Sequence, residues 1–191
     1  MVLPSSGTVL PRKSQKSVCD TVVGSDDDIP HDADPRIFDT YEYWRRIRDE
    51  IGCLPSRHDI DPLDLPAPIW PNLILSDLIA EPFSVLNRLV GTAVVEMDGF
   101  DSTGMRIEET IPRRKIEDVL TDYRTVAVRR HPHFRRIGLY DERLRNDIDV
   151  ERLHLPLATD GETVDKILTV FIRLNTEWMR GGTVFPTTSC A

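Results

Sequence analysis

The strongest constraint on the fold is a change of hydrophobic pattern along the chain. Residues 72–80 and 83–91 have the pattern of strands and flank a Glu-Pro turn. A helical pattern follows at 113–128, and residues 134–174 then contain three further strand-like segments. Strands joined by short connections pair antiparallel, and helices cover the face of such a sheet. The order therefore predicts an α+β fold with one antiparallel sheet and helices on one face.

A separate helix opens the ordered unit. Asp34 is a good N-cap residue, and Pro35 suits the first helical position. Gly52 suits the left-handed conformation in which helices end. The apolar stripe between these signals has helical spacing and consists of Ile37, Tyr41, Trp44, Ile47 or Arg48, and Ile51. We therefore expect an added helix ahead of the sheet.

The remaining elements have clear end signals. A short helix is expected to follow 83–91 and to end at Gly99. The longer helix at 113–128 has one apolar side, formed by Ile116, Val119 or Leu120, Tyr123 and Ala127. Asp160-Gly161 is the strongest hairpin signal, and it links the strand-like segments 149–158 and 164–174.

Composition changes at both ends of this unit. Residues 1–33 mix Ser, Thr, Pro and Gly with an acidic run and have no sustained period, which predicts a disordered or loosely attached arm. Residues 34–178 are expected to form one domain. Residues 179–191 contain a Gly-Gly pair and are expected to form a flexible tail.

The apolar content and the cysteines indicate a soluble cytoplasmic protein. Hydrophobic residues make up 40% of the chain, enough for a core, but no run reaches the length of a membrane span. The first residues lack the pattern of a secretory signal. Cys19, Cys53 and Cys190 are odd in number and form no CxxC pair, which predicts free thiols.

The net charge of −8 disfavours nucleic-acid binding, yet basic residues gather at 113–145. Two interpretations follow. These arginines form either a solvated face with acidic neighbours or a nucleic-acid surface, and the first is favoured. A nucleic-acid-associated regulator that uses residues 113–145 is kept as the alternative function.

Four segments resemble one known family. They are YWRRIR (Tyr43–Arg48), LPSRHDIDP (Leu54–Pro62), RLVGTAVVEMDGFDSTG (Arg88–Gly104) and ERLHLPLATDG (Glu151–Gly161). In this order they resemble a family of single-domain PAS proteins found mainly in alphaproteobacteria. The resemblance implies a five-stranded antiparallel sheet with helices on its inner face, and a sensory or regulatory role.

The function implied is that of a PAS-type sensory or protein-interaction module in bacterial signalling. We expect it to act in trans, because no kinase, cyclase or DNA-binding segment is visible. The ligand and the partner are not identified by the resemblance. An enzyme is not expected, because the chain has no GxSxG, P-loop or GxGxxG motif. The adjacent Ser56, Arg57 and His58 do not by themselves make a catalytic triad.

No cofactor or metal is predicted. Some PAS domains bind haem through a histidine on the long helix, and residues 113–128 contain none. Light-sensing PAS domains bind flavin beside a reactive cysteine in a helix motif, and Cys53 lies outside such a segment. His131 and His133 could chelate a metal, but no third ligand is placed by the sequence, so surface histidines are favoured.

Three residues are the candidates for ligand binding: Arg88, Met97 and Tyr123. Met97 and Tyr123 lie on helices that line the cavity of PAS domains, although an aromatic residue on a helix stripe more often belongs to the core. Arg88 could hold an anionic ligand from the cavity. The favoured interpretation is that Arg88 pairs with a carboxylate on a neighbouring strand.

Tyr41, Trp44 and Arg48 are the candidates for an interface. Tyr, Trp and Arg are the residues that dominate protein–protein contacts. The helix that carries them either caps its own domain or contacts a second copy in a homodimer, and both arrangements fit the sequence equally well.

Overall fold

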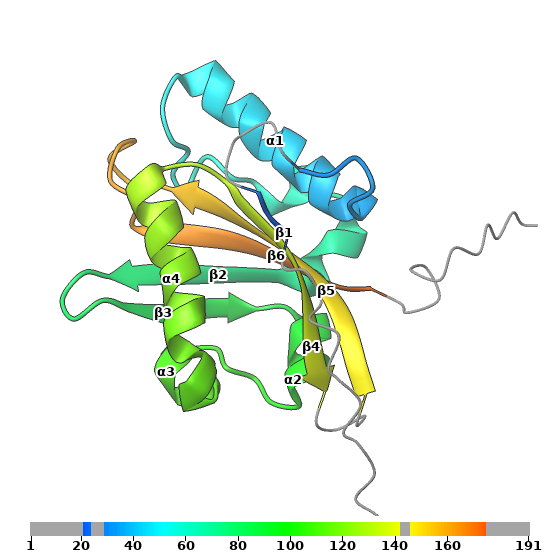
Figure 1. Cartoon of the computed structure of the whole chain (residues 1–191). Helices are drawn as coiled ribbons and strands as arrows, with labels where there is room; N and C mark the ends of the chain where they lie inside the picture. Colours follow the sequence, from blue (N-terminus) through cyan, green and yellow to red (C-terminus); the bar gives the residue numbers. More distant parts are fainter. Residues whose placement is uncertain (1–20, 24–28, 142–145, 175–191) are drawn as a thin grey trace, which may run out of the picture.

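The protein is described by a computed structural model that places residues 21–23, 29–141 and 146–174. Its elements are β1 (Thr21–Val23), α1 (Pro35–Ile51), the short 3-10 helices η1 (Pro62–Asp64) and η2 (Ala67–Asn72), β2 (Leu73–Ile79), β3 (Ser84–Val90), α2 (Thr92–Asp98), α3 (Ile107–Thr110), α4 (Arg113–Arg129), β4 (His133–Asp141), β5 (Asn146–Leu157) and β6 (Lys166–Leu174). Figure 1 shows their arrangement.

The strands form one antiparallel sheet in the order β1-β4-β5-β6-β2-β3. The five predicted strands are β2 to β6, so the α+β fold and its five-stranded antiparallel core are confirmed. The sheet brings β2 beside β6, the last strand, and this pairing joins the two halves of the chain. No described helix combines the length and the apolar character that a bilayer crossing requires.

Part of the segment predicted as a loose arm belongs to the sheet. Residues 21–23 pair with residues 134–136 at the edge of β4, and Ile29 and Ala33 are buried in the core. A run of three β-branched residues has high strand propensity but is too short to show a strand pattern in the sequence. The remainder of the arm (1–20 and 24–28) and the predicted tail (179–191) lie outside the described residues.

The end signals of α1 operate as predicted. The Asp34 side chain accepts a hydrogen bond from the Arg36 N–H at 3.0 Å, and Gly52 has φ of 76°. The Gly52 N–H donates to the Arg48 carbonyl at 2.8 Å and so satisfies one of the last carbonyls of the helix. The added N-terminal helix is therefore confirmed.

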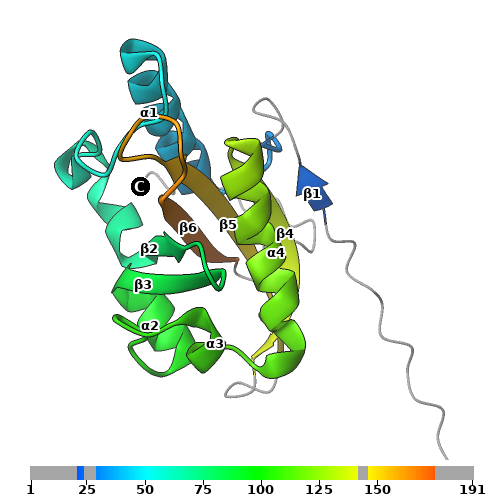
Figure 2. The same cartoon turned by 90° about the vertical axis from the view of Figure 1, so that its left-hand side faces the viewer.

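The alternating directions of the side chains along β5 show which helix covers which face of the sheet. Neighbouring residues of a strand point to opposite faces. The Glu151 carboxylate accepts a hydrogen bond from the Asp34 N–H at the start of α1, at 2.7 Å. The next side chain, Arg152, donates to Asp122 of α4. Hence α1 covers the outer face and α4 the inner face, and Figure 2 shows the two helices on opposite sides of the strands.

The core lies on both sides of β5. Every residue from 150 to 158 is buried, because α1 covers one face of this strand and α4 the other. Trp44 of α1 is completely buried, and its indole N–H donates to the Pro156 carbonyl at 3.0 Å. An aromatic side chain with a satisfied N–H stabilises a core through both its area and its hydrogen bond.

Replacing Trp44 tests this packing. We expect Trp44→Ala to lower the free energy of unfolding by about 3–5 kcal/mol, because a large cavity forms beneath α1. Trp70→Ala is the matched control, because Trp70 is 41% exposed, and we expect a loss of about 1–2 kcal/mol there. Urea unfolding of both variants measures the difference. Equal losses at the two positions would contradict the packing described for α1.

Candidate functional site

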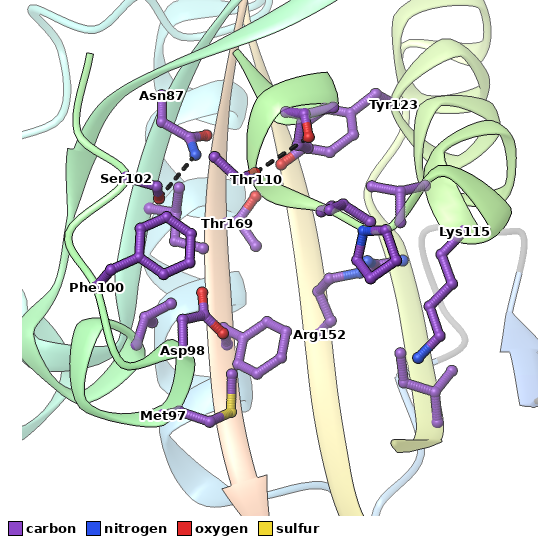
Figure 3. Close-up of a pocket in the computed structure, with 18 of the residues that line it drawn as sticks. Asn87, Met97, Asp98, Phe100, Ser102, Thr110, Lys115, Tyr123, Arg152 and Thr169 are labelled. Atoms are coloured by element: carbon purple, nitrogen blue, oxygen red, sulfur yellow. Dashed lines mark hydrogen bonds between the residues drawn. The ribbon is translucent and has the colours of Figure 1, made fainter. Parts of the chain in front are cut away.

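A pocket of about 520 Å³ lies between the inner face of the sheet and the layer formed by α2, α3 and α4. Figure 3 shows this pocket. The sheet contributes Ile74, Asn87, Ile137, Ile148, Arg152, Thr169 and Phe171, and the helical layer contributes Val94, Met97, Asp98, Phe100, Ser102, Ile107, Thr110, Ile111, Pro112, Lys115, Val119 and Tyr123. The volume and the mainly apolar lining are typical of a small-molecule site.

A chain of neutral hydrogen bonds supports one wall of the pocket. Ser76 Oγ donates to Asn87 Oδ1 at 3.1 Å, and Asn87 Nδ2 donates to Ser102 Oγ at 3.2 Å. The backbone of Asn87 also accepts from Gly104 N–H and donates to the Met105 carbonyl. Gly104 has φ of 82°, which favours glycine, so the loop can turn back onto β3 at this point.

A buried ion cluster supports the opposite wall. Arg135 Nη1 of β4 donates to both carboxylate oxygens of Asp122, at 3.0 and 2.8 Å. Arg152 Nη2 of β5 donates to the same carboxylate. The Asp122 and Arg152 side chains are only 8% and 9% exposed. Hydrogen bonds between ionised groups of low exposure are strong, so Asp122 holds α4 against both strands.

Two histidines lie beside this cluster. The His154 ring packs on Tyr123 with its centroid 4.6 Å away and faces the His133 ring at 6.4 Å. His154 Nδ1 shares a hydrogen bond of 2.7 Å with Thr169 Oγ1. Burial lowers the pKa of both histidines, that of His154 well below 6.5, and the nearby arginines add to the effect. Both rings are therefore held neutral in the folded chain.

The pocket lining carries one carboxylate, Asp98, among the described residues. Desolvation raises the pKa of Asp98 above its ordinary value. Lys115 of α4 stands across the pocket from Asp98, on the same side as Arg152 (Figure 3). The two sides of the pocket therefore differ in charge.

Of the three predicted ligand-binding residues, the pocket includes two. Met97 of α2 and Tyr123 of α4 are both lining residues. Arg88 is not, and its placement corrects the suggestion that it points into the cavity. Its Nε donates to Asp77 on the neighbouring strand at 2.5 Å, and its side chain is 55% exposed. This is the cross-strand pair that the sequence favoured for Arg88.

The predicted interface residues belong largely to the domain core. Trp44 and Tyr41 are 0% and 5% exposed, so the expectation that they contact a partner is corrected for these two side chains. Arg48 lies 5.1 Å above the Trp44 ring and pairs with Asp49 at 3.1 Å. The helix therefore caps its own sheet, which was one of the two arrangements expected. A homodimer stays a prediction.

The basic segment 113–145 does not form one surface. Arg135 points to the inner face and pairs with Asp122, whereas Arg136 points to the outer face and pairs with Glu151 at 2.6 Å. Arg124 pairs with Glu117 at 3.2 Å on the exposed side of α4. Since carboxylates compensate these cations, they offer little to phosphates. Arg143 and Arg145 lie outside the described residues.

His133, considered at first as a metal ligand beside His131, is a buried residue of β4. Within the described ranges, no cluster of three or more His, Cys, Asp or Glu side chains is arranged to hold a metal ion.

Sequence reasoning missed the ion cluster and its two histidines. Arg152 and His154 alternate with leucines in the segment RLHLPL. Such an alternation signals polar side chains on one face of a strand, but it does not show that this face is buried.

Comparison with known proteins identifies the domain. Residues 33–172, most of the chain, match a family model described as a PAS domain. No curated protein matches the sequence.

Solved structures resemble the chain only weakly. A light-oxygen-voltage domain studied with a flavin analogue is 14% identical, covers 56% of this chain and 79% of its own, and has a TM-score of 0.41. The light state of the Aureochrome1 LOV domain is 10% identical, with coverage of 57% and 85% and a TM-score of 0.40. A fungal LOV domain photoreceptor is 14% identical, with coverage of 66% and 99% and a TM-score of 0.38.

The buried histidines make stability depend on pH. In the unfolded chain a histidine takes up a proton near pH 6.5, but the folded chain binds that proton only at lower pH. Stability is therefore complete above this pH and falls as the pH drops below it. Each of the two histidines is expected to lower the free energy of unfolding by up to about 1.4 kcal/mol per pH unit.

Urea unfolding between about pH 7.5 and 5.5 measures this slope. His154→Gln should make the slope shallower, because one of the two buried rings is removed. His58→Gln is the control, since His58 lies on an exposed turn, and it should keep the slope of the parent chain. A parent slope of zero, or equal slopes for the two variants, would contradict the neutral state of His154.

Proposed function

Because the chain belongs to the PAS domain family and is therefore a PAS-type sensory module, we propose that its pocket binds a small molecule and that another protein detects the occupancy. The observation that carries this proposal is the pocket itself. Its volume of about 520 Å³ lies between the sheet and the helices, so a ligand would touch both layers at once.

The arrangement of the lining supports a transmitted signal. α2, α3 and α4 each contribute side chains to the pocket, for example Met97, Ile107 and Tyr123. A ligand that contacts the helices more favourably in one packing than in another shifts the population towards that packing. The outer surface of α4, where Val128 is 81% exposed, then changes its position relative to the sheet. We propose that a partner protein contacts this layer in trans.

We propose that the pocket binds its ligand without catalysing a reaction, and that the ligand is neither haem nor flavin. No histidine occurs in α4, and Cys53 is a free, exposed cysteine on the loop that follows α1. Ser102, a hydroxyl of the pocket, accepts a hydrogen bond from an amide and has no histidine among the lining residues described. We further propose a cytoplasmic location and a bacterial signalling role, which the free thiol and the resemblance of the four sequence segments support.

The first experiment asks whether the chain binds small molecules. Protein purified from its native host is analysed by denaturing mass spectrometry and by its ultraviolet-visible spectrum, which detect a retained compound. A thermal-shift screen with a metabolite library then finds compounds that bind the folded state, because such compounds raise the Tm. An empty screen together with the absence of a retained compound would overturn the proposal.

A pair of substitutions on α4 tests whether binding occurs in the pocket. Val119 lines the pocket, and Val119→Phe should raise the Kd of a bound compound by about tenfold or more, because filling a packed space costs about 1–3 kcal/mol. Val128→Phe makes the same change at an exposed position of the same helix and should leave the Kd unchanged. Calorimetric titration measures both values. Equal affinities in the two variants would place the bound compound elsewhere on the protein.

A further inference from the structure

The pocket wall contains a buried cation with an unused hydrogen-bond donor. Arg152 lines the pocket, and its side chain is only 9% exposed. Its Nη2 donates to Asp122, yet its Nε has no hydrogen-bond partner among the residues that the structure describes. A buried N–H of a charged group that has no acceptor lowers the stability of the folded state. Such groups are therefore rare in native proteins. An acceptor that enters the pocket would remove this cost.

Arg152 shares its counter-ion with a second arginine. Asp122 carries one negative charge and is shared by two guanidinium groups, those of Arg135 and Arg152. Burial lowers the pKa of Arg152, so its positive charge is held at a cost in the folded chain. The adjacent rings of His133 and His154 supply no negative charge in either protonation state. Arg152 therefore shares the carboxylate that it pairs with, Asp122, with a second guanidinium group.

The other charged residues of the pocket lining, Lys115 and Asp98, lie on different sides of the pocket. Lys115 adds a second cation on the side of Arg152, as Figure 3 shows. Asp98 stands on the other side of the pocket, as Figure 3 also shows. The side that carries Arg152 and Lys115 thus attracts an anion, and the only described lining carboxylate lies on the opposite side.

The remainder of the lining favours an apolar ligand body. Ile107, Ile137, Ile148 and Phe171 surround the same space, and a free inorganic ion would leave them without contacts. A wholly apolar ligand would bury this surface but would leave the Arg152 Nε without an acceptor. The two requirements are met together by a molecule with one anionic group and one apolar body.

We propose that the pocket binds an organic monocarboxylate, whose carboxylate accepts hydrogen bonds from Arg152 and whose apolar body packs on the isoleucine and phenylalanine side chains. This inference rests on the proposed function, because it names the class of ligand for the same pocket. Arginine suits the role, since its planar guanidinium matches the geometry of a carboxylate.

The test compares acids with their neutral amides. Octanoate and naphthylacetate are the probes, and octanamide and naphthylacetamide are the controls of the same shape. Calorimetric titration should show that each acid binds about tenfold to hundredfold more tightly than its amide, the range expected for a hydrogen bond to a charged partner. In the unmodified protein, the Nε–H resonance of Arg152 should shift when octanoate is added.

Arg152→Met should abolish the preference for the acids, so that each acid and its amide bind this variant with similar affinity. In this variant Asp122 still accepts a hydrogen bond from Arg135, and the Tm of the variant shows whether the domain is folded. Arg88→Met is the matched control, because Arg88 pairs with Asp77 outside the pocket, and it should retain the full preference.

The outcomes separate this inference from the proposed function. Amides that bind as tightly as the acids, and that Val119→Phe displaces, would overturn the carboxylate assignment and leave the ligand pocket intact. An Arg152 resonance that does not move on addition of octanoate would also overturn it. If neither acids nor amides bind and the library screen is empty as well, both proposals fall.

Discussion

Asp122 is the carboxylate through which the helical layer is joined to the sheet. It projects from α4 and accepts hydrogen bonds from Arg135 of β4 and Arg152 of β5, so three elements meet at one buried group. Removing the shared carboxylate of such a cluster typically costs about 3–5 kcal/mol, because buried guanidinium groups lose the charge that compensates them. The same contacts hold α4 over the pocket. The position of the helix and the electrostatics of the pocket therefore depend on one side chain.

Local features of the structure follow from local features of the sequence. The bounds of α1 could be predicted because an N-cap carboxylate at Asp34 and a left-handed position at Gly52 act within a few residues of themselves. Gly99 ends α2 in the same way, with φ of 81°. Strands β2 to β6 could be predicted because turn residues or charged residues interrupt the apolar runs. Each of these signals depends on backbone geometry, which nearby residues determine.

The pocket could be predicted only in part, because its wall is built from distant residues. Asp122 and Arg152 are 30 positions apart, and only the pairing of strands brings them together. Arg152 and His154 alternate with leucines along β5, but this alternation does not show whether the polar face meets water or a helix. Arg88 of β3 and Arg152 of β5 therefore look alike in the sequence, since each is an arginine within an apolar strand. One lies on the outer side in water, and the other lies beneath α4.

The alternation along β5 has a consequence for how this chain can vary. Glu151 accepts a hydrogen bond from the start of α1, and Arg152 donates one to Asp122 of α4. Consecutive residues of β5 therefore contact opposite layers of the domain. The pairing of β5 with β4 and β6 runs without a bulge across this region. Adding or deleting one residue here would exchange the two faces and would drive the guanidinium into the leucine layer under α1. A substitution in β5 therefore alters one side chain, whereas a change in the length of β5 alters the face of every side chain that follows it.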